Sequence, residues 1–344
     1  MAAPDVLLVS LGSTGGLRRA DTALAGAMRR SGASVTVAQA ARPREVRTMA
    51  LTDLGWARAA RAAARGALAS GRPRAVLYST TTAALLWPLP GAVRFDAPAA
   101  GNRPGRHGLW QRPLERRRLH AASLLVPWTP GGLKEVPAPR PGAVVVPVPV
   151  TSSGPSPTTA ERDIAAITYA TNPVKKGLDR VLTAWAAARR EGEELVVVGT
   201  GVPAGMPGVR ATGFLPVDEY RALVRRARVY ICAPRREDFG LAQLEALADG
   251  CALVTTTAPG PYAALGPARE LDERLVVPDL SPPAASQRRP PQSSPADPLA
   301  VALRTALDDP RAGYRERAAA LLVAYRPAAV DRVVADELLP ALLD

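Results

Sequence analysis

The sequence predicts an α/β protein made of two doubly wound domains, each with a parallel sheet covered by helices on both faces. Short apolar runs alternate with helical segments along the chain. This alternation stops once, at a Pro/Ser/Thr/Gly-rich stretch over residues 147–160, and then restarts. The chain has 344 residues, more than one hydrophobic core usually organises. Continuous apolar strands separated by helices are typical of parallel sheets that are buried on both sides.

The first domain is expected over residues 1–150. Its apolar runs predict strands at 5–12, 33–40, 75–80 and the segment before Trp128, and its helical patterns predict helices at 17–32, about 55–70 and 114–121. The Pro- and Ser-rich stretch then has the composition of a linker.

The second domain is expected over residues 151–325. The predicted strands are 163–170, 194–201, 208–214, 228–234 and 251–257, and the predicted helices are 177–192, 217–227, one from Gly240, 298–309 and 313–326. Residues 281–298 have the low complexity of an exposed loop, and a last apolar segment, 326–344, closes the chain.

The charge of the chain is unevenly distributed. Residues 1–150 contain 21 Lys and Arg against 7 Asp and Glu, whereas residues 151–344 contain 23 against 24. This asymmetry suggests an anionic partner for the first half, namely a membrane surface, a phosphorylated acceptor or nucleic acid. An Arg-rich composition that only solubilises the surface is the alternative. Aromatic residues make up 4% of the chain, too few for the stacking platforms of a single-strand nucleic-acid binder.

Cysteines and histidines are scarce. Cys232 and Cys251 cannot build a disulfide framework, and with His107 and His120 as the only histidines no metal site is expected. The N-terminus lacks a basic region before its short apolar run, and no stretch reaches the ~18 apolar residues of a membrane span. We expect a cytoplasmic protein, with peripheral attachment to the inner face of the membrane as an option.

The stretch REDFGLAQLEALADGCALVTT, residues 236–256, carries the most specific pattern. Glu237 falls in the loop after a strand, and Glu245 falls inside the helix that begins at Gly240 and Leu241. The first N–H groups of a helix suit a phosphate, and carboxylates accept hydrogen bonds from the hydroxyls of a sugar. On this helix Leu241, Leu244, Leu247 and Ala248 are expected to form one apolar arc, with Glu245 beside it. Either glutamate alone would more often be a solvated acid.

Residues 234–256 resemble the Glu-x7-Glu motif of retaining glycosyltransferases, family 4. Asp238, Leu247 and Ala252 replace the usual Gly, Met and Pro. The resemblance implies that Glu237 contacts the hydroxyls of the donor sugar and that Glu245 contacts the ribose. It also implies that the backbone of Phe239, Gly240 and Leu241 approaches sugar and phosphate.

A second match covers residues 167–201, ITYATNPVKKGLDRVLTAWAAARREGEELVVVGTG, which resemble the strand and Lys-Gly-Leu-Asp helix start of the same family. By this resemblance Lys176 binds the nucleotide diphosphate. Thr171 or Asn172 stands where the family has an arginine, and Lys175, Arg235 or Arg236 are the candidate substitutes. The stretch 209–216, with Gly213 and Phe214, is similar to the family segment that lines the nucleotide base.

The first domain resembles the family more loosely. Gly12, Gly15 and Gly16 form a Gly-rich turn before a helix, similar to the family's first loop. Asp96, near Arg94 at a predicted strand end, lies where many members keep a His that touches the donor sugar, so Asp96 is a candidate catalytic residue beside Glu237 and Lys176. Trp128 or Thr129 replaces a conserved Ser. His120 is expected to be structural, and His107 has an unsupported acceptor-binding option.

The resemblance implies the GT-B fold, two Rossmann-like domains facing across a cleft. The acceptor would bind to 1–150 and a UDP-, GDP-, ADP- or TDP-linked sugar to 151–325, and 326–344 would cross back to the first domain. The implied reaction is transfer of a hexose with retained anomeric configuration, without metal or cofactor, to an acceptor that the sequence does not identify; an anionic or lipid-linked acceptor fits the basic half. The alternatives are an epimerase or hydrolase of sugar nucleotides, and a catalytically silent relative that binds anionic lipid or RNA.

Overall fold

The computed structural model describes residues 3–44, 46, 48–103, 105–155, 157–158, 161–280 and 297–344, with His107 described by its backbone only. The expected loop at 281–298 therefore lies almost entirely outside the described residues. The chain divides into two compact units. Unit 1 comprises Met1–Pro149 and Ala324–Asp344, and unit 2 comprises Val150–Val323.

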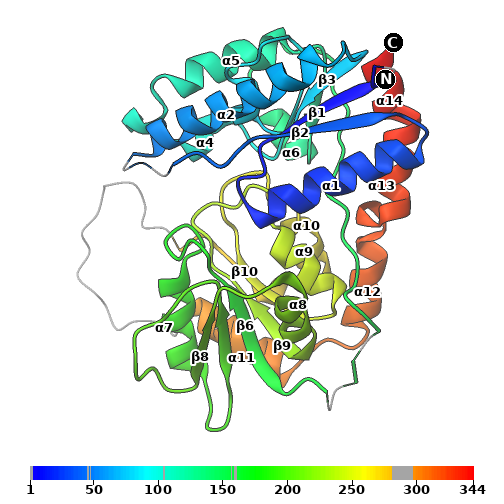
Figure 1. Cartoon of the computed structure of the whole chain (residues 1–344). Helices are drawn as coiled ribbons and strands as arrows, with labels where there is room; N and C mark the ends of the chain where they lie inside the picture. Colours follow the sequence, from blue (N-terminus) through cyan, green and yellow to red (C-terminus); the bar gives the residue numbers. More distant parts are fainter. Residues whose placement is uncertain are drawn as a thin grey trace. The chain divides into compact units, whose positions relative to one another are not determined.

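Unit 1 contains a five-stranded parallel sheet in the order β2-β1-β3-β4-β5 (Figure 1). The strands are β1 (Val6–Ser10), β2 (Val35–Gln39), β3 (Ala75–Tyr78), β4 (Ala92–Phe95) and β5 (Leu125–Pro127). The helices between and after them are α1 (Gly15–Arg30), α2 (Met49–Ala69), α3 (Thr81–Ala84), α4 (Ala99–Asn102), the 3-10 turn η1 (Gly105–Gly108), α5 (Gln111–Ala121) and α6 (Pro130–Lys134). Helix α2 begins earlier than expected, because Thr48 caps it by accepting a hydrogen bond from the Leu51 N–H at 3.3 Å.

Two apolar clusters cover the two faces of this sheet. Successive residues of β1 point to opposite faces, so Val6 and Leu8 join the cluster with α1, whereas Leu7 and Val9 join the cluster with α2 and α5. The C-terminal segment packs on the α1 side through α13 (Pro327–Val333), a π-helical turn (Val334–Leu338) and α14 (Leu339–Leu343). The Arg30–Asp331 ion pair, 2.7 Å long, joins it to α1.

Unit 2 contains a six-stranded parallel sheet in the order β11-β10-β9-β6-β7-β8. The strands are β6 (Ile164–Tyr169), β7 (Leu195–Val198), β8 (Val209–Gly213), β9 (Ala227–Ile231), β10 (Ala252–Thr256) and β11 (Val276–Val277). The helices are α7 (Leu178–Ala188), α8 (Val217–Arg226), α9 (Leu241–Ala248), α10 (Leu265–Asp272), the 3-10 turn η2 (Glu273–Leu275), α11 (Pro298–Asp308) and α12 (Tyr314–Leu321), followed by a 3-10 turn (Val323–Tyr325).

The strand order of unit 2 reverses at β6. From β6 the chain builds outward through β7 and β8, and it then returns to place β9 on the other side of β6. Open parallel sheets bind their ligands outside the carboxyl ends of the strands at such a switch point, because the two crossover helices diverge there. The loops after β6 and β9 are therefore the expected location of a site in this unit.

Gly177, between the β6 loop and α7, tests how tightly these loops pack. Its φ is +64°, and a Cβ there would lie 1.9 Å from the Ala233 carbonyl oxygen. Gly192 has a φ of +80° but open space around an added Cβ, so Gly192→Ala should lower the free energy of unfolding by only about 1 kcal/mol, the cost of the left-handed backbone. Gly177→Ala should cost about 2–4 kcal/mol, since the overlap adds to that strain. Equal losses in urea denaturation of the two variants would contradict this packing.

Candidate functional site

The candidate site lies at the carboxyl ends of β6 and β9 in unit 2. The loop after β6 carries Lys175 and Lys176, and the loop after β9 carries Glu237 and Asp238. Several contacts join the loops. Arg235 N–H donates to the Lys175 carbonyl at 2.9 Å, and the two lysines form ion pairs with the two carboxylates. The topology of the sheet thus places the two main sequence motifs side by side.

Glu237 occupies the centre of these contacts and is 5% exposed. Its Oε2 accepts hydrogen bonds from Lys176 Nζ at 2.7 Å and from Gln243 Nε2 at 3.0 Å. Among the described residues none donates a hydrogen bond to Oε1. One oxygen is therefore held by the protein, while the other can accept hydrogen bonds from ligand hydroxyls.

The charge of Lys176 depends on Glu237. Burial alone would lower the pKa of Lys176, but the Glu237 carboxylate more than offsets it through charge attraction and the hydrogen bond, so the pKa lies above 10.5. Lys176 is consequently a fixed cation near neutral pH. A compact ammonium in this position suits a phosphate group.

The N-terminus of α9 adds a second anion-binding feature. Gly240 adopts a left-handed φ of +85° as the N-cap, and no side chain caps the helix. A Cβ at Gly240 would lie 2.6 Å from the Tyr262 ring, so glycine is required both by the backbone and by the packing. The backbone N–H groups of the first turn therefore have no capping side chain, which favours an anion there.

The apolar arc expected on α9 is wrong in part. Leu241 and Ala248 are only half-buried, whereas the polar Gln243 and Glu245 are buried together with Leu244, Ala246 and Leu247. The helix buries polar side chains because other segments provide partners: Gln243 contacts Glu237, and Glu245 lies 3.4 Å from Arg221 in an ion pair. Glu245, the predicted ribose ligand, is thus a buried and paired carboxylate.

The turn after β6 shows what occupies the place of the family arginine. Asn172 Oδ1 accepts from the Lys175 N–H at 3.0 Å and its carbonyl accepts from the Lys176 N–H at 2.9 Å, so Asn172 shapes the lysine turn. Thr171 is exposed and lies against Gly199, whose added Cβ would be 2.7 Å from Thr171 Cγ2. Neither side chain carries a positive charge.

The candidate substitutes for that arginine all form ion pairs. Lys175 Nζ lies 2.6 Å from Asp238, Arg236 Nε lies 2.8 Å from the same carboxylate, and Arg235 lies 2.7 Å from Asp179. The two cations around Asp238 lower its pKa despite burial, which alone would raise it. Lys175 and Arg236 are therefore the nearer candidates for a second phosphate contact, since Asp238 holds both beside Glu237.

The predicted base-lining residues lie at the end of β8. Gly213 has a φ of +68°, and Phe214 is 79% exposed. An aromatic ring left exposed at the carboxyl edge of a sheet suits stacking against a planar base. The structure places it on the same edge as the Lys176 and Glu237 loops.

In unit 1 the expected Gly-rich turn needs correction. Only Gly12 takes a left-handed φ, +56°. Gly15 and Gly16 belong to the first turn of α1, because Thr14 caps this helix by accepting from the Leu17 N–H at 3.2 Å. The turn after β1 is therefore shorter than the sequence suggested.

Asp96 follows β4, is half-buried, and accepts from the Ala97 N–H at 2.8 Å. Arg94 is fully buried within β4, pairs with Asp21 at 3.4 Å and stacks on the Trp128 ring at 4.9 Å, so it stabilises the core. Thr129 caps α6 through the Gly132 N–H at 2.9 Å.

The two histidines and the expected absence of metal ligands and membrane spans are the remaining points of the sequence prediction. His120 lies in the last turn of α5, and the side chain of His107 is outside the described residues. In the described part of the chain, no group of three or more His, Cys, Asp or Glu side chains is arranged to hold a metal ion. The described helices include none long and apolar enough to cross a membrane.

Sequence reasoning missed Gln243, Arg221 and Asp249. Gln243 lies inside the recognised motif but at a position that helical periodicity marks as neutral. Arg221, on α8, contacts both Glu245 and Asp249. These contacts join segments more than twenty residues apart, so no local pattern indicated them.

Part of the second unit is similar to a known protein family. Residues 162–287, which include Lys176, Glu237 and Glu245, match the family model described as "Glycosyl transferases group 1". No curated protein sequence matches the chain.

Solved structures share the fold of the whole chain. Sucrose-phosphate synthase from Thermosynechococcus elongatus is similar with a TM-score of 0.71 at 14% identity, over 96% of each chain. WaaG, a glycosyltransferase involved in lipopolysaccharide biosynthesis, is similar with a TM-score of 0.68 at 15% identity, over 96% of this chain and 99% of that chain. An α,α-trehalose-phosphate synthase (UDP-forming) from Burkholderia xenovorans gives 0.63 at 15% identity, over 98% and 99%. These likenesses confirm the expected α/β fold with two parallel sheets, which is GT-B.

The pKa of Lys176 tests the central ion pair. In Glu237→Gln the opposing charge is lost while burial remains, so the pKa of Lys176 should fall below 10.5. Side-chain NMR of Lys176 across a pH titration measures this shift. Asp179→Asn, which removes the partner of Arg235 on the exposed side of the same loops, is the control and should leave the titration of Lys176 unchanged. An unaltered pKa in Glu237→Gln would show that the carboxylate does not hold the lysine charge.

Proposed function

We propose that this chain transfers a hexose from a nucleotide-sugar donor to an acceptor, on the premise that its residues 162–287 match the family model described as "Glycosyl transferases group 1". The family is that of retaining, nucleotide-sugar-dependent GT-B enzymes, and we propose retention for this chain as well. The observation that carries the proposal is the Lys176–Glu237 pair beside the N-terminus of α9. It combines a fixed cation, an available carboxylate oxygen and backbone N–H groups that no side chain caps.

Each of these groups has a role in the proposed reaction. The donor diphosphate binds between Lys176 and the first turn of α9 after Gly240, where the negative charge that develops on the leaving group is stabilised. Glu237 Oε1 accepts hydrogen bonds from the sugar hydroxyls and orients the anomeric carbon. Glu245 holds the ribose, and Phe214 stacks on the base. The backbone of Phe239, Gly240 and Leu241 approaches the sugar and the phosphates.

The proton balance of the transfer does not require a histidine. The anomeric C–O bond to the diphosphate breaks and a bond to the acceptor oxygen forms on the same face of the sugar. The acceptor proton passes to the leaving phosphate oxygen, which gains negative charge as the bond breaks and is close to the incoming hydroxyl. The protein then supplies positioning and charge, and no side-chain base is needed.

We assign acceptor binding to unit 1. Its switch point lies between β1 and β3, where Gly12 and the Leu11 N–H, which donates to Ser79 Oγ at 3.1 Å, shape the sheet edge. Asp96, after β4, lies at this same edge and is retained as a candidate contact to the transferred sugar. The acceptor itself is proposed as anionic or lipid-linked, for the reason that follows.

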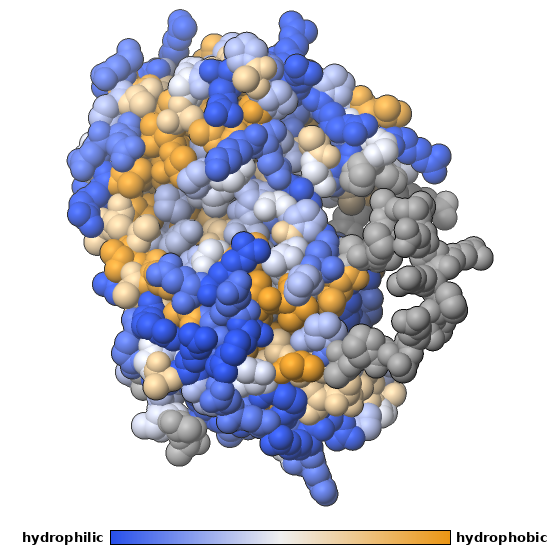
Figure 2. All heavy atoms as spheres, turned by 180° about the vertical axis from the view of Figure 1, so that it is seen from behind, coloured by the Kyte–Doolittle hydropathy of each residue, from blue (hydrophilic) through white to orange (hydrophobic). Residues whose placement is uncertain are grey.

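Unit 1 carries a basic face on α2 and α5. The only acidic residues of these two helices, Asp53 and Glu115, are buried. Their exposed or half-buried charged residues are all arginines: Arg58, Arg61, Arg65, Arg112, Arg116, Arg117 and Arg118. Long hydrophilic side chains project from unit 1 in the space-filling view (Figure 2). Such a face attracts phosphate groups of an anionic membrane or of a charged acceptor, which supports a place at the inner face of the membrane.

Two alternatives are distinguished from a transferase, one by its products and the other by its binding. An epimerase or hydrolase on this fold would release an epimer or free sugar from the nucleotide sugar alone. A silent relative that binds anionic lipid or RNA would bind no nucleotide sugar. A thermal-shift panel of UDP-, GDP-, ADP- and TDP-sugars tests the silent relative, since a donor at 100 times its Kd stabilises the fold by about 2.7 kcal/mol.

Loss of Glu237 tests the proposed donor site. Glu237→Ala should lower kcat for transfer by roughly 10²–10³-fold, because a contact to the reacting sugar and the partner of Lys176 are both removed. Glu273→Ala, an exposed acid in the same unit, is the matched control and should transfer at the wild-type rate. Product formation from the donor found in the panel is followed by chromatography; full activity in Glu237→Ala would remove this carboxylate from the mechanism.

The basic face predicts salt-sensitive membrane binding. Liposomes with anionic lipid should co-sediment the protein, and binding should weaken as salt rises because the charges are screened. Arg116→Glu with Arg117→Glu, two exposed positions of α5, should reduce binding, whereas Arg190→Glu, an exposed arginine of unit 2, should not. Equal binding to neutral liposomes at all salt concentrations would exclude this surface as an electrostatic contact.

A further inference from the structure

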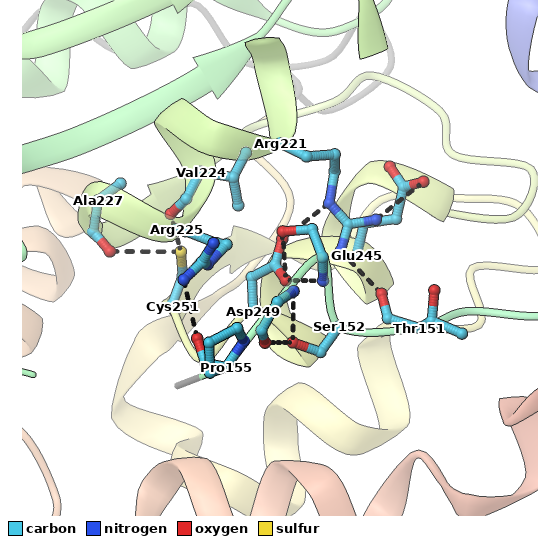
Figure 3. Close-up of polar contacts among 12 residues, drawn as sticks. Thr151, Ser152, Pro155, Arg221, Val224, Arg225, Ala227, Glu245, Asp249 and Cys251 are labelled. Atoms are coloured by element: carbon cyan, nitrogen blue, oxygen red, sulfur yellow. Dashed lines mark hydrogen bonds and ion pairs between the residues drawn. The ribbon is translucent and has the colours of Figure 1, made fainter. Parts of the chain in front are cut away.

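A buried polar network surrounds Glu245 of α9. Arg221 of α8 stands between the carboxylates of Glu245 and Asp249, and dashed lines join it to both and to Thr151 (Figure 3). The three charged side chains are 9%, 6% and 0% exposed, in that order. Buried charges persist only where partners compensate the loss of water, so this cluster must be held in one arrangement.

The guanidinium of Arg221 is fixed at two positions that do not involve Glu245. Its Nε donates to Asp249 Oδ2 at 2.7 Å and its Nη2 donates to the Thr151 carbonyl at 2.8 Å. Asp249 is fixed in turn, since it accepts from the Ser153 N–H at 2.7 Å. Burial alone would lower the pKa of Arg221, but its hydrogen bond and charge contacts with Asp249 outweigh burial and raise it. Arg221 is therefore a rigid and permanent cation.

The third nitrogen of this guanidinium faces Glu245. The Arg221 Nη1 to Glu245 Oε1 distance is 3.4 Å, longer than the contacts with Asp249 and Thr151. The guanidinium thus orients the carboxylate of Glu245 from one side without holding it in a short bidentate pair. A carboxylate that accepts hydrogen bonds from a diol needs a fixed orientation of this kind.

We propose that Arg221 is a positioning residue that keeps Glu245 oriented for the ribose hydroxyls of the donor. The inference rests on the proposed function, in which Glu245 is the ribose ligand. Asp249 and the Thr151 carbonyl act on Glu245 only through Arg221, because they orient its guanidinium. Arg221 itself touches neither the sugar nor the reacting phosphate.

The test combines a protein change with removal of the ribose hydroxyls. Isothermal titration gives the Kd of the tightest-binding nucleoside diphosphate among UDP, GDP, ADP and TDP, and of its counterpart that lacks the sugar hydroxyls. In the wild type the missing hydroxyls should weaken binding by roughly 10–100-fold. The Kd without the hydroxyls divided by the Kd with them is the hydroxyl ratio. In Arg221→Lys, which keeps a positive charge but loses the guanidinium and its three separate contacts, the hydroxyl ratio should fall to about 3 or less.

Two further variants separate positioning from a merely structural role. Asp249→Asn removes the anchor but leaves Arg221 in place, so the hydroxyl ratio should fall part of the way. Arg225→Lys changes a neighbour on α8 that donates to the Pro155 carbonyl at 2.9 Å; it disturbs the same entry segment of unit 2 and should keep the wild-type ratio. Thermal unfolding of each variant is measured alongside, and a general loss of packing would weaken both nucleotides equally.

The outcomes distinguish this inference from the function it rests on. A wild-type hydroxyl ratio in Arg221→Lys, with nucleotide binding otherwise intact, would overturn the role of Arg221 while the proposed transferase stands. Equal weakening of both nucleotides would assign Arg221 to folding alone and also overturn the proposal. If the wild-type protein bound none of the four nucleotides, the proposed function would fail and this inference with it.

Discussion

The ion pair between Lys176 and Glu237 is the interaction on which the rest of the donor-side account depends. It places opposite charges 2.7 Å apart in a largely buried setting, where each compensates for the water that the other has lost. Two constraints of the fold make it possible. The parallel sheet reverses its strand order at β6, so the loops after β6 and β9 emerge side by side. Gly177 and Gly240 then let the backbone turn where a side chain would collide with Ala233 or Tyr262.

The residues around the ion pair give the two carboxylate oxygens of Glu237 different roles. Gln243 and Lys176 both donate to Glu237 Oε2, which leaves Oε1 for hydroxyl groups. Lys175 and Arg236 are held beside the pair by Asp238, and they keep positive charge near the proposed diphosphate although Thr171 and Asn172 cannot supply it. Further along α9, Arg221 pairs with the second glutamate, Glu245. Helix α9 thus buries two polar side chains, Gln243 and Glu245, each against a charged network, and its N-terminus is the proposed diphosphate site.

The sequence predicted the α/β class, most strands and the two motifs, because buried parallel strands and capped helices leave local patterns. Glu237 and Lys176 are predicted site residues because the motifs around them, residues 234–256 and 167–201, resemble those of a known family. The patterns failed where tertiary contacts override local rules. Helical periodicity marked Leu241 and Ala248 as core, whereas distant partners allow Gln243 and Glu245 to be buried. Gly15 and Gly16 suggested a loop, but the cap at Thr14 draws them into α1. Arg221 and Asp249 left no signal, since their pairing depends on α8 and α9 packing together.

A crystal structure of the protein with its tightest nucleoside diphosphate tests the central claim most directly. The account predicts that the terminal phosphate lies within hydrogen-bond distance of Lys176 Nζ and of the backbone N–H groups that follow Gly240, with the ribose hydroxyls on Glu245. Lys176 should then be shared between the phosphate and Glu237 Oε2, while Oε1 faces the space that the donor sugar would fill. A diphosphate bound away from the β6 and β9 loops, with the Lys176–Glu237 pair undisturbed, would contradict the account.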